Sequence, residues 1–185
     1  MLIGLIDVGG FDFSHPDFLD ADGNTRWLAI WDQGGDARPA PKGDRFGYGA
    51  EFSKAHLDAA LAAAPRLGVP AYEVERQSQL VEGAHGTHVA SIAAGNRGIC
   101  RRSPIAGVLI ALPDSDEDRR RSFYDSTRIA DAVDYLVALG THPPMSDAQL
   151  TRRFGSEVVD GWMGRSRIHN HRWNDPEALS TLGTI

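Results

Sequence analysis

The sequence predicts an α/β fold with a mostly parallel sheet. Short runs of Leu, Ile, Val and Trp alternate along the chain with longer segments of helical periodicity. A chain with this pattern buries parallel strands beneath crossover helices. The expected strands are residues 2–8, 27–31 and 105–112, and the expected helices are residues 53–64, 83–96 and 126–140. We therefore expect three or more parallel strands, with the last two helices packed on them.

Composition places the chain among globular proteins and excludes several functional classes. Hydrophobic residues make up 42% of the 185 residues and charged residues 24%, which excludes a disordered chain. Apolar stretches are far shorter than the roughly 20 residues of a membrane helix. A net charge of −6 gives no global attraction for nucleic acid or for anionic membranes. Cys100 is the single cysteine, so an internal disulfide and a zinc–thiolate site are both excluded.

The first expected strand, residues 2–8, stops at Gly9-Gly10. A strand that is buried on both faces is a nearly continuous apolar run, so we expect this strand near the centre of the sheet. The opening segment MLIGLIDVGG lacks the basic region of a signal peptide. A chain that begins directly with a core strand predicts either a missing upstream part or a cytoplasmic protein, and the compartment stays unassigned.

Turn and cap signals place the middle elements. The run WLAIW at residues 27–31 is the second strand, and the Gly/Pro-rich residues 32–49 predict a loop. Ser53 is a typical N-cap residue for the first helix. The apolar face of that helix consists of Leu57, Ala60, Leu61 and Ala64. The second helix, within GAHGTHVASIAAGN, is rich in small residues that allow close packing on a sheet, and Gly95-Asn96 supplies its stop.

The last expected helix follows the third strand. Asp125 or Ser126 caps it, and Gly140 is expected to end it. Its apolar face consists of Ile129, Ala132, Val133, Leu136 and Val137. Beyond Gly140 the periodicity is lost, so we expect a boundary between residues 1–140, which carry the domain, and a divergent tail at 141–185.

Two residues stand out as candidates for chemistry. Asp7 lies at the carboxyl end of a buried strand, where α/β sheets place functional groups, although a loop-capping Asp fits the position equally well. His85 begins the second helix, and Gly83 and Gly86 are expected to leave its ring unobstructed. An ordinary histidine at a helix start is the simpler alternative for His85.

Two segments resemble the subtilisin-like serine proteases (subtilases). GLIDVGGFDFSHPDF is similar to their catalytic-Asp segment, and GAHGTHVASIAAGN is similar to their catalytic-His segment. The second match is specific, because HGTHVA followed by a small residue and then AAGN is hard to reach by chance. SPIAGVLIAL and SFYDSTRIADAVDYL are similar to the strand and the helix that follow, so the resemblance covers roughly residues 1–140.

The resemblance implies a fold and an activity. The fold would be a three-layer subtilisin-like α/β fold with helices on both faces, present as a truncated copy. The activity would be serine-type endopeptidase hydrolysis of protein or peptide substrates. Asp7 would orient the imidazole, and His85 would be the general base. The resemblance implies no cofactor, and the net charge of −6 predicts no nucleic-acid or membrane partner. A structural calcium ion is compatible with the resemblance but has no specific motif here, and the oligomeric state is unassigned.

The chain departs from the family where the nucleophile belongs. No Gly-Thr-Ser-Met-Ala segment surrounds any of its twelve serines, and the least unlike context is that of Ser180. Asn170 and Asn174 match the family's oxyanion asparagine by residue type alone. Two milder departures are Val8, where Thr or Ser is usual, and Ser91, where Gly is usual. The chain as given is therefore expected to be inactive.

Metal sites are the competing interpretation of the same residues. His88 lies three residues after His85, so both could bind a metal with Asp7, but the segment lacks the Glu and spacing of H-E-x-x-H. We expect His88 to be packed and hydrogen-bonded instead. His169 and His171 are expected at the surface. The run DADGNT at residues 20–25 begins like a calcium loop, but it lacks the later Glu, and a turn is the expected structure.

Two functions follow from these observations. The first is a subtilase-type serine endopeptidase domain, present as an incomplete copy. The second is a non-catalytic subtilase-like module, a pseudoprotease that binds a peptide or a partner. The nucleophile separates them: a gene that continues past Ile185 into a serine segment supports the first, and a gene that ends there supports the second. The sequence also predicts a hydrogen bond, within about 3.2 Å, between Asp7 and His85.

Overall fold

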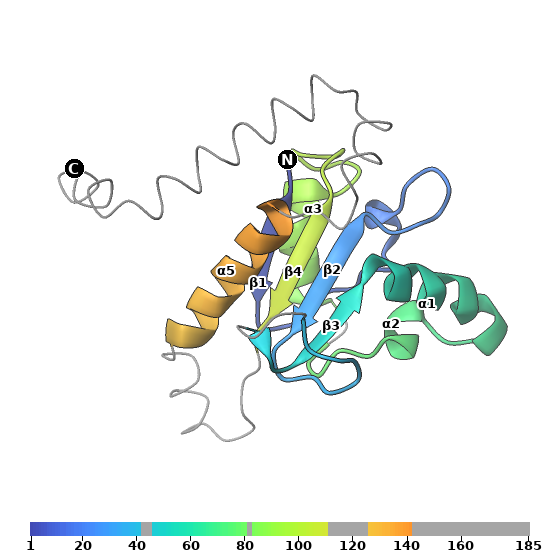
Figure 1. Cartoon of the computed structure of the whole chain (residues 1–185). Coiled ribbons are helices and arrows are strands. Elements are labelled where there is room, and N and C mark those ends of the chain that lie inside the picture. Colours follow the sequence, from blue (N-terminus) through green and yellow to red (C-terminus); the bar gives the residue numbers. More distant parts are fainter. Residues whose placement is uncertain (42–45, 81–82, 111–125, 142–185) are drawn as a thin grey trace. The chain divides into compact units, whose positions relative to one another are not determined.

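A computed structural model describes residues 1–41, 46–80, 83–110 and 126–141 (Figure 1). The chain divides into two units, Met1–Leu136 and Val137–Ile185. The sheet and all of its helices except the last residues of α5 belong to the first unit. The predicted boundary at residue 140 stays a prediction, because residues 142–185 lie outside the described part of the chain.

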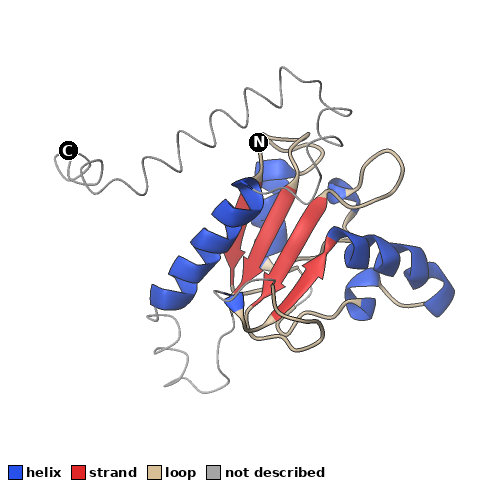
Figure 2. Cartoon of the chain, in the orientation of Figure 1, coloured by secondary structure: helices blue, strands red, loops and turns tan. Residues whose placement is uncertain are grey.

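A four-stranded, mostly parallel sheet is the centre of the first unit (Figure 2). Its strands are β1 (Ile3–Asp7), β2 (Trp27–Asp32), β3 (Ala50–Ser53) and β4 (Ile105–Leu109). Their order is β1-β4-β2-β3, with β4 parallel to both β1 and β2 and with β3 antiparallel to β2. The predicted α/β class and the three parallel strands are confirmed.

The central position predicted for the first strand is wrong among the described strands. β4 and β2 occupy the middle of the order, and β1 lies at its end. All five residues of β4 are buried, whereas burial alternates along β1, and Ile6 is 36% exposed. A short apolar run therefore does not distinguish a central strand from an edge strand that is covered on one face.

The sequence did not predict β3. Its residues 50–53 follow a Gly/Pro-rich loop, and its last residue, Ser53, is also the N-cap of α1 (Lys54–Leu67). A four-residue strand that runs straight into a helix leaves no separate turn signal. Burial alternates along β3 because one of its faces lies toward the core.

The predicted N-cap of the first helix, Ser53, is confirmed. α1 starts after Ser53 but continues past the predicted end at Ala64, through Pro65, to a left-handed stop at Gly68 with φ of 68°. α3 (His85–Ala94) ends at Gly95, as predicted. The short helix α2 (Ala71–Val74) and the single 3-10 turn η1 (Pro16–Phe18) were not predicted.

Helices lie on both faces of the sheet (Figure 1). On one face, Leu57 of α1 and Ala90 of α3 join a buried cluster with Phe11 and Leu109. On the other face, the Tyr135 ring of α5 (Ser126–Thr141) lies 5.1 Å from that of Trp31. The aromatic cluster beneath α5 also includes Phe46 and Tyr48.

The buried face of α5 differs from the predicted one. Ala132 and Tyr135 are 0% and 4% exposed, whereas Ile129 and Val133 are 45% and 47% exposed. The hydroxyl of Tyr135 donates to Glu51 of β3 at 2.7 Å, so a polar contact helps to select the stripe that meets the sheet. Gly140 does not end the helix, which continues to Thr141.

Candidate active site

Asp7 and His85 form a hydrogen bond across 78 residues of sequence. Asp7 is the last residue of β1, and His85 is the first residue of α3. Nδ1 of His85 lies 2.7 Å from Oδ2 of Asp7, within hydrogen-bond distance. The predicted contact is therefore present, and the catalytic roles assigned to the two residues remain predictions.

Backbone donors fix the orientation of the Asp7 carboxylate. Its Oδ1 accepts from the N–H groups of Val8 at 2.9 Å and Gly9 at 2.8 Å, which leaves Oδ2 for His85. The side chain of Asp7 is only 9% exposed. A carboxylate held by three donors has one orientation, and that orientation faces the imidazole.

The imidazole of His85 is open to solvent, with 79% of the side chain exposed. An ionised carboxylate can only accept hydrogen bonds, so Nδ1 carries the ring proton in this pair. Nε2 then keeps its lone pair. Asp7 orients the ring, and the basic Nε2 is available to a reactant that reaches it.

Gly86 allows α3 to approach the loop that follows β1. A Cβ atom at Gly86 would lie 2.7 Å from the carbonyl oxygen of Gly10 and 3.0 Å from Cγ of Asp7. Gly83 has a different role: its φ of 70° is in the left-handed region, and nothing lies within 4 Å of its added Cβ. One glycine therefore permits the contact, and the other permits the turn that leads into the helix.

Two further side chains hold the same loop, and the sequence did not single them out. Oγ1 of Thr87 accepts from the N–H of Asp12 at 2.9 Å. Gln77, which is 3% exposed, hydrogen-bonds both the N–H and the carbonyl oxygen of Phe11. A lone Gln outside any motif carries no sequence signal, whereas Thr87 lies inside HGTH and was reachable from that motif.

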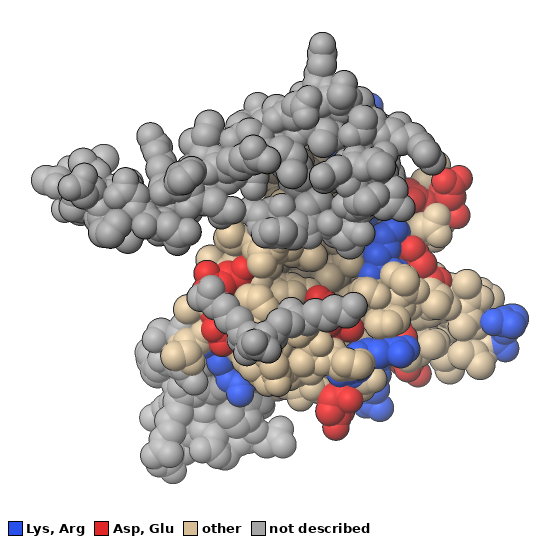
Figure 3. Space-filling view, in the orientation of Figure 1, with Lys and Arg blue, Asp and Glu red and all other residues tan. Residues whose placement is uncertain are grey.

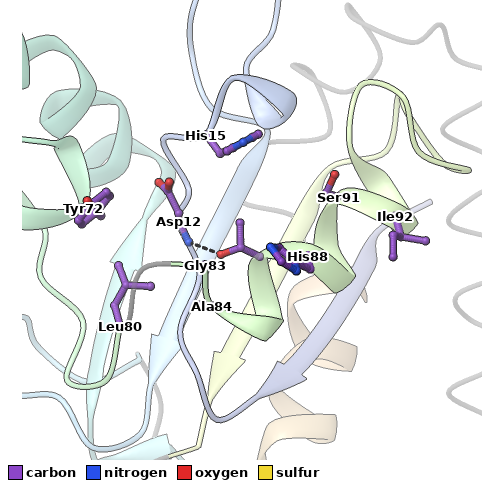
Figure 4. A pocket seen from close by; sticks show the side chains of 10 residues that line it. Asp12, His15, Tyr72, Leu80, Gly83, Ala84, His88, Ser91 and Ile92 are labelled. Atoms are coloured by element: carbon purple, nitrogen blue, oxygen red, sulfur yellow. Dashed lines mark hydrogen bonds between the residues drawn. The ribbon is translucent and has the colours of Figure 1, made fainter.

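A cavity of about 560 Å³ lies beside the first turns of α3 (Figure 4). Asp12 and His15 reach it from the loop after β1, Tyr72 from α2, and His88 and Ser91 from α3. Gly83 and Ala84, which precede His85 in the chain, form part of its wall. The wall thus combines one carboxylate and two imidazoles with apolar surface.

His88 is exposed rather than packed, which corrects the expectation from the sequence. It lies at the cavity, one turn of α3 beyond His85. Within the described ranges, no group of three His, Cys, Asp or Glu side chains is arranged to hold a metal ion. The side chains of Asp7, His85 and His88 therefore do not make a metal site of that kind.

Three serine hydroxyls among the described residues donate to acidic side chains. Ser14 donates to Asp12, Ser78 to Asp32 and Ser91 to Asp17. In this part of the chain, no serine hydroxyl hydrogen-bonds to His85. Ser180, Asn170, Asn174, His169 and His171 all lie outside the described residues.

The segment at residues 20–25 is a turn, as predicted. Oδ1 of Asp20 accepts from the N–H groups of Asp22 at 3.0 Å and Asn24 at 2.9 Å. The backbone bond from Asn24 is the main cause that lowers the pKa of Asp20. Leu19 and Thr25 pair across the turn.

Among the atoms that Figure 3 draws in colour, basic and acidic residues are interspersed. The ion pairs include Lys54 with Asp58 at 3.0 Å and Arg38 with the buried Glu75. Among the described residues, no helix is both long and apolar enough to cross a membrane.

Comparisons with solved structures give a distant likeness. No family model matches the chain, and no curated protein matches it. The solved structure of the CspB protease of Clostridium perfringens is similar, with 24% identity and a TM-score of 0.45. The match covers 72% of this chain and 27% of that chain, so this chain spans about a quarter of that protein's length. Identity and TM-score at these levels assign neither a family nor an activity.

Proposed function

We propose that the chain carries the general base and the orienting carboxylate of a subtilase-type serine endopeptidase site. The hydrogen bond of 2.7 Å between Asp7 and His85 carries this proposal, together with the exposure of the ring. In such a site the imidazole removes the proton of a serine hydroxyl, and the carboxylate stabilises the imidazolium that forms. The three-layer fold expected for that family is compatible with helices on both faces of the sheet.

The substrate class that fits is a polypeptide. The cavity beside α3 has room for part of a peptide, and its wall, which includes Ala84 but not His85, offers both polar and apolar surface. Hydrolysis of a peptide bond also needs a nucleophile and donors for the oxyanion. Among the described residues, Ser14, Ser78 and Ser91 donate to acidic side chains rather than to His85. We therefore expect the 185-residue chain by itself to turn over little or no protein substrate.

The first test measures what the imidazole of His85 contributes on its own, separately from the activity of a complete protease. A p-nitrophenyl ester is activated enough to be hydrolysed by an oriented imidazole alone. We expect His85→Ala to lower this rate by about tenfold or more, because it removes the general base. His56→Gln is the matched control, since His56 lies on α1 outside the cavity wall, and its replacement should leave the rate unchanged. Equal rates for the wild-type chain and His85→Ala would contradict the proposal.

A fluorophosphonate probe and an unfolded protein substrate test the missing nucleophile. Removal of the serine from a complete triad costs on the order of 10⁶ in kcat, so we expect neither labelling nor cleavage. Labelling of one serine that disappears in His85→Ala, together with cleavage, would show instead that the chain is a self-sufficient enzyme.

The alternative function is a non-catalytic module that binds peptides. The hydroxyl partners of Ser14, Ser78 and Ser91 are acidic side chains rather than His85, which favours this alternative over a complete triad in the described residues. Binding of unfolded peptides without His85-dependent ester hydrolysis would support it.

A further inference from the structure

The orientation of Asp7 depends on the backbone that follows it. Two of the three donors to its carboxylate are the N–H groups of Val8 and Gly9. Any rotation of these two peptide groups would turn the carboxylate away from His85. The conformation of residues 8–11 therefore decides whether the Asp7–His85 hydrogen bond forms.

Gln77 holds this loop through two hydrogen bonds to the backbone of Phe11. Its Oε1 accepts from the N–H of Phe11 at 2.9 Å, and its Nε2 donates to the carbonyl oxygen of Phe11 at 2.7 Å. Phe11 is fully buried, so water is not available to these two backbone groups. One amide side chain thus satisfies the donor and the acceptor of the same residue, as a neighbouring strand would.

The segment around Gln77, residues 75–78, is itself anchored to the sheet. The carboxylate of Asp32, a fully buried residue at the end of β2, accepts from the backbone N–H of Ser78 at 2.5 Å and from its hydroxyl at 2.6 Å. Glu75 is paired with Arg38, and this hydrogen bond raises the pKa of the Arg38 guanidinium. The segment is therefore fixed before and after Gln77.

Close packing continues the connection to Asp7. A Cβ atom at Gly10, where φ is 79°, would lie 2.3 Å from the carbonyl oxygen of Gln79. The ring of Phe11 also lies beneath the first turn of α3, 2.9 Å from an added Cβ at Gly86. A displacement of Phe11 would therefore also move the loop that orients Asp7 and the first turn of α3, which carries His85.

We infer that Gln77 is a positioning residue for the Asp7–His85 pair. It acts through Phe11 and the loop at residues 8–11, and Asp32 supports it through Ser78. A carboxylate at the end of β2 thereby stabilises the orientation of a carboxylate at the end of β1. The importance of this connection for catalysis rests on the proposed function. Its effect on the tautomer of His85 does not depend on that function.

The test reads the tautomer of His85 in the full 185-residue chain. Long-range ¹H–¹⁵N spectra distinguish an imidazole with the proton on Nδ1 from one with the proton on Nε2. In the wild-type chain we expect the Nδ1–H form to dominate. In Gln77→Met, which keeps the side-chain volume but lacks both hydrogen bonds, we expect the ratio of the two tautomers to fall about fivefold to tenfold, the effect of weakening one charge-assisted bond.

Gln33→Met is the matched control for burial. Gln33 is also 3% exposed and also donates to a backbone carbonyl, that of Arg128, but it holds no part of the loop after β1. We expect this variant to be destabilised without a change in the His85 tautomer. If Gln77→Met does not fold, Ser78→Ala replaces it, because Ser78 is exposed and keeps its backbone bond to Asp32. A smaller shift in the same direction is expected there.

The outcomes separate the two proposals. A wild-type His85 without the Nδ1–H form would remove the Asp7–His85 pair, and both proposals would fail together. A dominant Nδ1–H form that neither Gln77→Met nor Ser78→Ala changes would overturn only the positioning role. A shift in Gln33→Met as large as that in Gln77→Met would also overturn it, since the effect would then follow general destabilisation.

Discussion

At the scale of single residues, the site depends on contacts too close to admit any added atom. Gly86 is the clearest case, because an added Cβ would meet Gly10, Phe11 and Asp7 at 3.0 Å or less. We expect Gly86→Ala to force α3 away from the loop and to cost about 1–3 kcal/mol of unfolding free energy. Urea unfolding measures this cost.

Gly47→Ala is the control for that prediction. Nothing lies within 4 Å of an added Cβ at Gly47, and its backbone is not left-handed. The change in its unfolding free energy should stay within about 0.5 kcal/mol. Equal unfolding free energies for Gly86→Ala and Gly47→Ala would contradict the prediction, because α3 would then accommodate the added methyl group without a loss of stability.

Asp7→Asn tests the pair itself. The amide oxygen must take the place of Oδ1, because the N–H groups of Val8 and Gly9 donate to that position. The amide NH₂ group then faces Nδ1 of His85, which has to become an acceptor. We expect His85 to switch to the Nε2–H tautomer in ¹⁵N spectra, with loss of His85-dependent ester hydrolysis. An unchanged tautomer would show that Asp7 does not set the ring proton.

The sequence reached some of these residues and missed others for a physical reason. Asp7 and His85 were found because each lies in a segment whose neighbours carry a pattern, a strand end and HGTH. Gln77 acts through two hydrogen bonds to the backbone of Phe11. Because nearly every residue type has the same backbone groups, the sequence does not show which of them a side chain will bind. Its role emerges only when the loop and the 75–78 segment are placed together.

At the scale of elements, the far end of α3 is capped by a side chain from another part of the chain. The guanidinium of Arg26 donates to the carbonyl oxygens of Ala94, Asp17 and Ser103. Burial lowers the pKa of this guanidinium, and the nearby Asp17 opposes that effect. Arg26 therefore joins the helix end, the turn before β2 and the turn before β4.

Arg26→Met should be strongly destabilising. It removes the donor from the carbonyl oxygens of Ala94 and Ser103, whereas that of Asp17 keeps the N–H of Asn96. We therefore expect a loss of about 2–4 kcal/mol in unfolding free energy. Arg97→Met, which changes an exposed arginine just after the same helix, should cost no more than about 0.5 kcal/mol. Thermal or urea unfolding of both variants checks the prediction, and equal losses would contradict it.

Element prediction succeeded where a cap marks an end and failed where packing decides. Ser53 and Gly95 bound α1 and α3 as their types predict. The apolar residues of α5 form two adjacent stripes, and the periodicity alone does not say which of them meets the sheet. Contacts of Tyr135 with Trp31 and Glu51 decide in favour of one stripe.

At the scale of the whole molecule, α5 joins its helical layer to both β2 and β3 through Tyr135. The ring packs on Trp31, and the hydroxyl donates to Glu51 at 2.7 Å. Burial, followed by the charge of Glu51, raises the pKa of Tyr135 far above its usual value of 10.0. The folded chain therefore keeps the hydroxyl proton at a pH where the unfolded chain loses it.

This difference predicts a loss of stability at high pH. The raised pKa stabilises the fold fully below about pH 10, and the stability falls as the pH rises above that value, because only the unfolded state ionises. Tyr135→Phe should lose about 1.5–3 kcal/mol at pH 8, where the bond to Glu51 is intact, but should then depend less on pH up to pH 11. Tyr72→Phe, in the cavity wall, is the control and should keep the wild-type dependence. Parallel curves of unfolding free energy against pH for Tyr135→Phe and the wild-type chain would show that Tyr135 does not hold its proton in the fold.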